Sequence, residues 1–211
     1  PKIKFCGMNS LELCKLAIEL EVNYLGFILY SRSPRNVSFD FLKEVQSLDF
    51  QNTQPVLVLV NPNREDVEQA LELMPQAILQ FHGDESEGFC KSFKQPYWKA
   101  IGISDDSDFS YSAHYSSAEK ILYDTKIDGS SGGTGKAFDW NILKAIQAKN
   151  FVLAGGINIH NLNEALKLNP AVIDINSGIE CSPGKKSISL MEQLLIRYKA
   201  HERSEEHTSE L

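Results

Sequence analysis

The chain has 211 residues, of which 42% are hydrophobic and 23% are charged, a composition typical of a globular protein with a substantial core. This length fits one large domain better than two small ones, since single α/β barrels run to about 200–250 residues. The formal net charge of -7 argues against a generic nucleic-acid binder, which would show a basic face. No apolar stretch approaches the ~20 residues of a membrane span, so we expect a cytoplasmic protein that binds neither nucleic acid nor membrane.

Short β-rich runs alternate with longer amphipathic segments along nearly the whole chain. In chain order, strands are expected over Lys2–Cys6, Tyr24–Leu29, Pro55–Val60, Ala77–Gln80, Tyr97–Ile101, Lys120–Tyr123, Phe151–Ala154 and Val172–Ile175. Helical patterns cover Ser10–Leu20, Asn63–Leu73, Asp139–Ala148, Asn158–Leu168 and Ser187–Ala200. The polar stretch Ser104–Ser117 is the weakest unit, and we expect it to be largely loop.

This alternation implies right-handed βαβ units and a parallel sheet. Eight units in about 200 residues predict an α/β protein with a single (β/α)8 TIM barrel, parallel and eight-stranded, over residues 1–202. No G-x-G-x-x-G follows any predicted strand, which removes the main sequence support for an open doubly wound sheet.

The C-terminal segment 203–211 loses apolar periodicity altogether. Its sequence, Arg203-Ser204-Glu205-Glu206-His207-Thr208-Ser209-Glu210-Leu211, is similar to the translated read-through of a common sequencing adapter. We therefore expect a non-native or disordered tail; an ordinary acidic tail is the alternative, and neither has an assigned function.

Four cysteines are scattered without a C-x-x-C pair or clustered histidines: Cys6, Cys14, Cys90 and Cys181. Such spacing supports neither a zinc site nor a disulfide framework, so we expect free thiols and no bound metal.

Polar residues collect where the predicted strands end, which in parallel barrels is the functional rim. Cys6 and Asp124 end the first and sixth runs, as a thiol and a carboxyl that could act as base and acid on one substrate. Gln80 and His82, two residues apart, share a strand face and are candidates for substrate contact.

Two cationic side chains complete the predicted rim. Arg35 follows Pro34 in a loop with no obvious neighbouring acid, so we expect it to stand on the rim and pair with a substrate carboxylate. Lys4 shares the inward face of Cys6 and would need a partner there, because an unpaired buried charge is costly. Asp174 on the neighbouring strand is the natural candidate.

The last two strand ends suit a phosphate group. Gly155 and Gly156 allow close backbone approach, and Ser177 and Gly178 offer amides and a hydroxyl before a possible short helix. Barrels often bind phosphate at this seven–eight position. The glycine-rich loop after the sixth strand adds Gly133 to the phosphate-binding candidates.

Together these motifs resemble the phosphoribosylanthranilate isomerase family of tryptophan biosynthesis. The matching pieces run in the expected order from Pro1 to about Ala200: Lys4-Phe5-Cys6-Gly7, Gly26-Phe27-Ile28, Ser33-Pro34-Arg35, Val60-Asn61, Leu79-Gln80-Phe81-His82-Gly83, Asp124, Gly132-Gly133-Thr134-Gly135, Phe138-Asp139-Trp140, Leu153-Ala154-Gly155-Gly156, Asp174 through Glu180, and Pro183-Gly184. Two departures are Asn176, where the family often has serine, and the extended Thr125–Asp128 after Asp124.

The resemblance implies an Amadori rearrangement of N-(5-phosphoribosyl)anthranilate, with Asp124 as general acid and Cys6, as thiolate, as general base. Arg35 would hold the anthranilate carboxylate and the glycine loops the phosphate, with Gln80, His82 and Asp174 also contacting the substrate. It implies no cofactor and no partner beyond the substrate, in a monomer or weak homodimer. The thiolate needs nearby donors, since a free thiol is mostly protonated at neutral pH.

Two alternatives stay open at this point. Another phosphosugar barrel enzyme, such as the isomerase of histidine biosynthesis or indole-glycerol-phosphate synthase, would share the phosphate loops. Cys6 argues against both, because the first resemblance would favour aspartate there and the second would want extra rim lysines and glutamates. A non-catalytic phosphate-metabolite-binding barrel, or an inactive product of a chimeric reading frame, is the alternative of a different class, with Cys6 as an inert core thiol.

Overall fold

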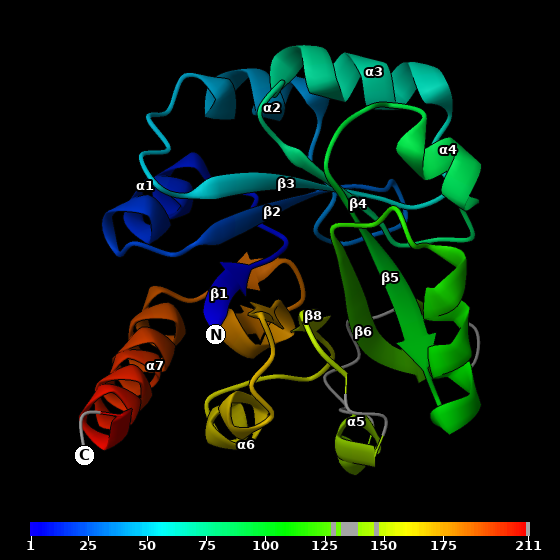
Figure 1. Cartoon of the computed structure of the whole chain (residues 1–211). Helices are drawn as coiled ribbons and strands as arrows, with labels where there is room; N and C mark the ends of the chain where they lie inside the picture. Colours follow the sequence, from blue (N-terminus) through cyan, green and yellow to red (C-terminus); the bar gives the residue numbers. More distant parts are fainter. Residues whose placement is uncertain (128–129, 132–138, 146–147, 210–211) are drawn as a thin grey trace.

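A computed structural model describes residues 1–127, 130–131, 139–145 and 148–209. Within these residues, eight parallel strands form a closed barrel in the order β5-β4-β3-β2-β1-β9-β8-β6, with β6 pairing back to β5 (Figure 1). They are β1 (Lys2–Phe5), β2 (Tyr24–Leu29), β3 (Gln54–Leu59), β4 (Ile78–Phe81), β5 (Tyr97–Ile103), β6 (Lys120–Ile127), β8 (Phe151–Leu153) and β9 (Val172–Ile175). The predicted (β/α)8 barrel is confirmed.

Helices surround this barrel on its outer side (Figure 1). They are α1 (Leu11–Glu19), α2 (Phe39–Gln46), α3 (Arg64–Leu73), α4 (Glu87–Lys91), α5 (Asn141–Ala145), α6 (Leu162–Lys167) and α7 (Ile188–Ser209). Several begin at a short polar side chain that accepts a backbone N–H of the first turn, as Ser10 does for α1, Ser38 for α2 and Asn63 for α3. No helix among the described residues is long and apolar enough to cross a membrane.

Three details differ from the sequence-based expectations. The stretch expected to be loop contains a 3-10 helix, η1 (Asp106–His114), which a capping box between Asp105 and Asp108 initiates. Strand β6 does not end at Asp124 but runs to Ile127, where it pairs antiparallel with β7 (Ser130–Ser131). Helix α7 continues to Ser209, so residues 203–209 of the expected tail are helical, and they are exposed.

The barrel interior is filled by alternate residues of each strand. At the amino-terminal end, Tyr24 and Trp98 pack edge to face with ring centroids 5.0 Å apart. Apolar side chains such as Val56, Leu122 and Val152 complete this inner layer. Because the lower barrel is packed, polar side chains that face inward from the carboxyl ends of the strands lie over a closed floor.

Candidate active site

A pocket opens at the carboxyl ends of the strands and encloses about 770 Å³ of empty space, part of it in its open mouth. Its wall includes most of the site residues predicted from the sequence: Cys6, Arg35, Gln80, His82, Asp124, Gly155, Gly156, Asp174 and Ser177. Gly178 does not line the pocket, and Gly133 lies outside the described residues.

Cys6 follows β1 directly and is 5% exposed, with its backbone N–H donating to Ile175 O at 2.9 Å. Burial raises the pKa of the Cys6 thiol, and the charges of Lys4 and Lys186 oppose that shift without cancelling it. The expected donors are therefore present, but in the free protein the protonated thiol is favoured. Gly26 makes room for the sulfur, because a Cβ there would lie 2.8 Å from Cys6 Sγ.

The predicted pairing of Lys4 with Asp174 is confirmed. Lys4 Nζ donates to Asp174 Oδ2 at 2.9 Å and to Gln80 Oε1 at 3.0 Å, and the lysine is fully buried. Burial by itself lowers the pKa of Lys4, yet the Asp174 carboxylate raises it above its ordinary value, and Cys6 adds to that effect in its thiolate form. The second oxygen of Asp174, Oδ1, has no hydrogen-bond partner among the described residues.

A chain of hydrogen bonds connects this ion pair to Asp124. Because an ammonium only donates, the atom of Gln80 that faces Lys4 is its carbonyl oxygen, and its amide NH2 faces His82 Nδ1 at 3.0 Å. His82 Nδ1 therefore accepts, and the ring proton lies on Nε2, which is 3.2 Å from Asp124 Oδ2. The buried lysine thus selects the tautomer of His82.

Asp124 lies within β6 and is 7% exposed. Besides facing His82, it accepts the backbone N–H of Thr125 through Oδ1 at 2.7 Å. Gly155 packs directly against it: φ is +92°, and a Cβ there would lie 2.6 Å from Asp124 Oδ1. A side chain at position 155 would therefore displace the carboxylate.

The environment of Arg35 differs from the expectation that it has no neighbouring acid. Arg35 is 7% exposed rather than standing free on the rim, and it does have an acid partner, Glu180. Its Nε donates to both carboxylate oxygens at 3.1 and 2.9 Å, and Nη2 donates to Oε1 at 2.6 Å. Lys186 donates to the same carboxylate at 3.0 Å. Sequence reasoning did not find Glu180 and Lys186 as site residues.

The missed residues belong to a hairpin formed by β10 (Glu180–Ser182) and β11 (Lys185–Lys186). Glu180 pairs with Lys186 in the antiparallel register. The turn between the strands is Pro183-Gly184, with φ of +80° at Gly184. This Pro-Gly dipeptide is a turn signal, and it could have predicted that the two opposite charges meet across a hairpin.

The two glycine-rich turns lie next to each other. Gly155 and Gly156 follow β8 with φ of +92° and +71°, while Ser177 begins the 3-10 turn η2 (Ser177–Ile179) after β9. The possible short helix is thus a single 3-10 turn. A Cβ at Gly178 would lie 2.0 Å from Ile157 O, so glycine there allows the two turns to approach.

A (β/α)8 barrel with a thiol, a carboxyl and an arginine around one carboxyl-end pocket has the architecture of a barrel enzyme that acts on a small molecule. The family model for N-(5'phosphoribosyl)anthranilate (PRA) isomerase matches residues 3–196. The N-(5'-phosphoribosyl)anthranilate isomerase of Legionella pneumophila (strain Corby) is 40% identical over 187 residues, which cover 88% of this chain and 90% of that protein. The isomerase of Hahella chejuensis is 34% identical over 196 residues, 92% of each chain.

Solved structures agree with these sequence matches. Phosphoribosyl anthranilate isomerase from Thermotoga maritima has a TM-score of 0.85 at 27% identity, covering 94% of this chain and 98% of that chain. A phosphoribosyl anthranilate isomerase in complex with reduced 1-(o-carboxyphenylamino)-1-deoxyribulose 5-phosphate has a TM-score of 0.82 at 26% identity, with the same coverage. The chain belongs to the N-(5'-phosphoribosyl)anthranilate isomerase family, which are enzymes of tryptophan biosynthesis.

Proposed function

We propose that the chain converts N-(5'-phosphoribosyl)anthranilate to 1-(2-carboxyphenylamino)-1-deoxyribulose 5-phosphate by an Amadori rearrangement, with Cys6 as general base and Asp124 as general acid. The observation that carries this assignment is that both side chains line one pocket from separate strands. Asp124 in its acid form protonates the furanose oxygen as the C1–O bond opens to an iminium. Cys6 as thiolate then removes the C2 proton, and the resulting enolamine relaxes to the ketone.

Deprotonation of Cys6 requires charges that stabilise the thiolate, because burial favours the thiol form in the free protein. Lys4 and Lys186 already act toward the thiolate. Ring opening adds a third positive charge, the iminium, next to the carbon that loses its proton. A nearby cation favours the charged form of a thiol, so the substrate itself contributes to activating its base.

Substrate positioning follows from the remaining groups around the pocket. Arg35 would hold the anthranilate carboxylate, while the turns with Gly155, Gly156, Ser177 and Gly178 hold the phosphate; Gly133 is a further candidate from outside the described residues. Gln80, His82 and Asp174 Oδ1, which has no hydrogen-bond partner among the described residues, would bind the sugar hydroxyls. Two distant anchors fix the reacting carbons between acid and base. No cofactor is required, since the iminium is the electron sink.

The test measures the fluorescence change of purified protein mixed with phosphoribosylanthranilate. Cys6→Ala and Asp124→Asn should each lower kcat by roughly 10²–10⁴-fold. Cys181→Ala, which removes an exposed thiol, is the matched control and should keep full activity. Full activity of either site variant would reject that residue's role. Tight substrate binding without turnover by the unaltered protein would instead favour the non-catalytic binder.

The oligomeric state is proposed as monomer or weak homodimer, and the location as cytoplasmic. The isomerase of Thermotoga maritima, 28% identical with a TM-score of 0.79, is described as dimeric. Light scattering over a range of protein concentrations tests the state of this chain, and a stable dimer at low concentration would contradict the proposal.

A further inference from the structure

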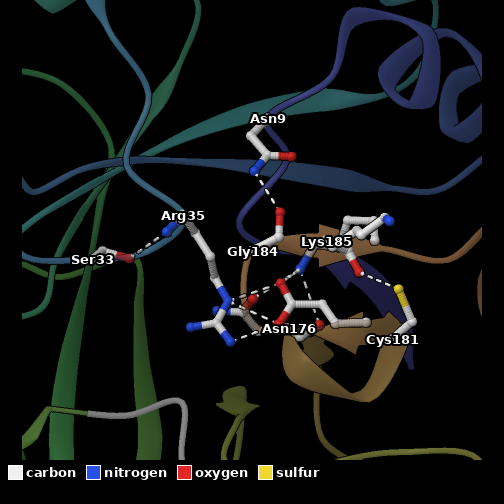
Figure 2. Close-up of polar contacts among 9 residues, drawn as sticks. Asn9, Ser33, Arg35, Asn176, Cys181, Gly184 and Lys185 are labelled. Atoms are coloured by element: carbon white, nitrogen blue, oxygen red, sulfur yellow. Dashed lines mark hydrogen bonds and ion pairs between the residues drawn. The ribbon is translucent and has the colours of Figure 1, made fainter.

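A buried charge cluster lies behind the wall of the pocket, next to Cys6. Lys186 Nζ donates to Glu180 Oε2 at 3.0 Å, to Asn176 Oδ1 at 2.9 Å and to Asn176 O at 3.0 Å. These three acceptors satisfy all three donors of an ammonium. In Figure 2 the side chain of Arg35 extends toward Asn176 and the hairpin that carries Gly184 and Lys185.

Only part of this cluster reaches the pocket. Arg35 and Asn176 line it, whereas Glu180 and Lys186 do not, and their side chains are 2% and 0% exposed. Glu180 and Lys186 therefore act on a bound molecule through their charges and through their neighbours. The charge of Lys186 also favours the Cys6 thiolate, and Glu180 has no assigned part in the acid–base chemistry proposed above.

The charges of the cluster define what Lys186 adds. Arg35 and Glu180 alone form a neutral pair, and a neutral pair attracts a substrate carboxylate weakly. Lys186 brings the cluster to a net charge of +1. Glu180 occupies Nε and Nη2 of Arg35, so it also fixes the plane of the guanidinium and leaves Nη1 without a hydrogen bond to any described residue.

The close packing around Gly7 shows that the chain leaves space for the charge cluster beside Cys6. Gly7 has φ of +73°, and a Cβ there would lie 2.8 Å from Arg35 Cδ, 2.8 Å from Asn176 Oδ1 and 3.3 Å from Lys186 Nζ. Because Gly7 has no side chain, Arg35, Asn176 and Lys186 can lie close to the backbone next to Cys6.

We propose that Lys186 supports carboxylate recognition by charge: it offsets the charge of Glu180 and keeps the cluster positive, so that Arg35 can bind the aromatic carboxylate of the substrate. This inference rests on the proposed function, in which Arg35 meets that carboxylate. Lys186 acts through Arg35 and does not touch the substrate.

The test compares two probes by calorimetry: reduced 1-(o-carboxyphenylamino)-1-deoxyribulose 5-phosphate, and the same compound without its ring carboxyl group. Lys186→Met should weaken binding of the carboxylate probe by roughly 10- to 100-fold and leave binding of the other probe unchanged. The matched control is Lys185→Met, because Lys185 is exposed and its strand neighbour Lys186 is buried. It should bind both probes like the unaltered protein.

A double variant separates charge from packing. Adding Glu180→Gln to Lys186→Met restores the net charge of +1, so affinity for the carboxylate probe should return to within about threefold of the starting value. Equal losses for both probes, or a double variant weaker than Lys186→Met alone, would show a structural role and overturn the inference. Failure of the unaltered protein to bind the carboxylate probe would overturn the proposed function, and with it this inference.

Discussion

Replacing Asp174 with asparagine leaves the ammonium of Lys4 buried without its counter-charge. Lys4 is fully buried, its Nζ lies 2.9 Å from Asp174 Oδ2, and its remaining partner in this chain of bonds is the neutral Gln80. Removing one partner of a buried ion pair costs about 3–5 kcal/mol. Asparagine retains an oxygen acceptor, so we expect the lower end, about 3 kcal/mol.

Thermal and urea denaturation measure this loss. For a chain of this size, about 3 kcal/mol lowers Tm by roughly 6–12 °C. The double variant Lys4→Met with Asp174→Leu removes both charges and should recover most of the loss, since well-packed apolar residues replace a buried pair at little cost. A loss below about 1 kcal/mol in Asp174→Asn, or a double variant less stable than the single one, would refute the reasoning.

The pH dependence of the same loss gives a second check. The folded-state pKa of Lys4 is raised, so the contribution of the pair is fully present below the unfolded-state pKa of about 10.4. It is lost as the pH rises through the folded-state value. In Asp174→Asn burial acts on Lys4 without the carboxylate, so the folded-state pKa of Lys4 falls in the variant and the variant loses that proton first. The stability difference between Asp174→Asn and the unaltered protein should therefore shrink as the pH rises from about 7 to about 10. A difference that grows over this range would contradict the direction of the Lys4 shift.

Three further changes test the site and the C-terminal helix. Gly155→Ala should lower kcat by about 10²-fold, because its Cβ would displace the Asp124 carboxylate, whereas Gly88→Ala at an exposed position of α4 should keep full activity. Equal activity of both variants would contradict the steric argument. Gln80→Glu places a carboxylate on each side of the His82 ring. The ¹⁵N NMR spectrum should then show a doubly protonated ring, and kcat should fall at least about tenfold. A ring that keeps its single proton on Nε2 would contradict the proposed role of Gln80. Deleting residues 203–211 should change Tm and kcat little, because residues 203–209 are exposed; a large loss in calorimetry would show that the segment packs.

The alternation of inward and outward residues explains why most of the pocket could be predicted. A strand places every second side chain on the same face. Once each run is identified as a barrel strand, Lys4 and Cys6 are therefore predicted to share one face, and so are Gln80 and His82. The same period limits the prediction for β6. The apolar run ends at Asp124 because Asp124 faces the pocket, while the strand continues through its pairing with β7.

The partner of Arg35 could not be predicted by strand periodicity. Glu180 is 145 positions away and belongs to a hairpin that adds no strand to the barrel. A polar loop arginine without a local acid is normally exposed, and that reasoning failed because the acid comes from the far end of the chain. Only the Pro183-Gly184 turn signal pointed to the hairpin, and it says nothing of where the hairpin packs.

Both lysines that flank Cys6 are tied to a carboxylate, Lys4 to Asp174 and Lys186 to Glu180. Each carboxylate offsets much of the electrostatic field of its lysine at the sulfur. Burial therefore has the largest effect, and the pKa of Cys6 stays raised in the protein without substrate. Asp174 retains one oxygen without a partner among the described residues. A sugar hydroxyl that donates to that oxygen would draw part of its charge away from Lys4 and Cys6. Substrate binding and ring opening would then both shift Cys6 toward the thiolate, which confines the reactive base to the occupied site.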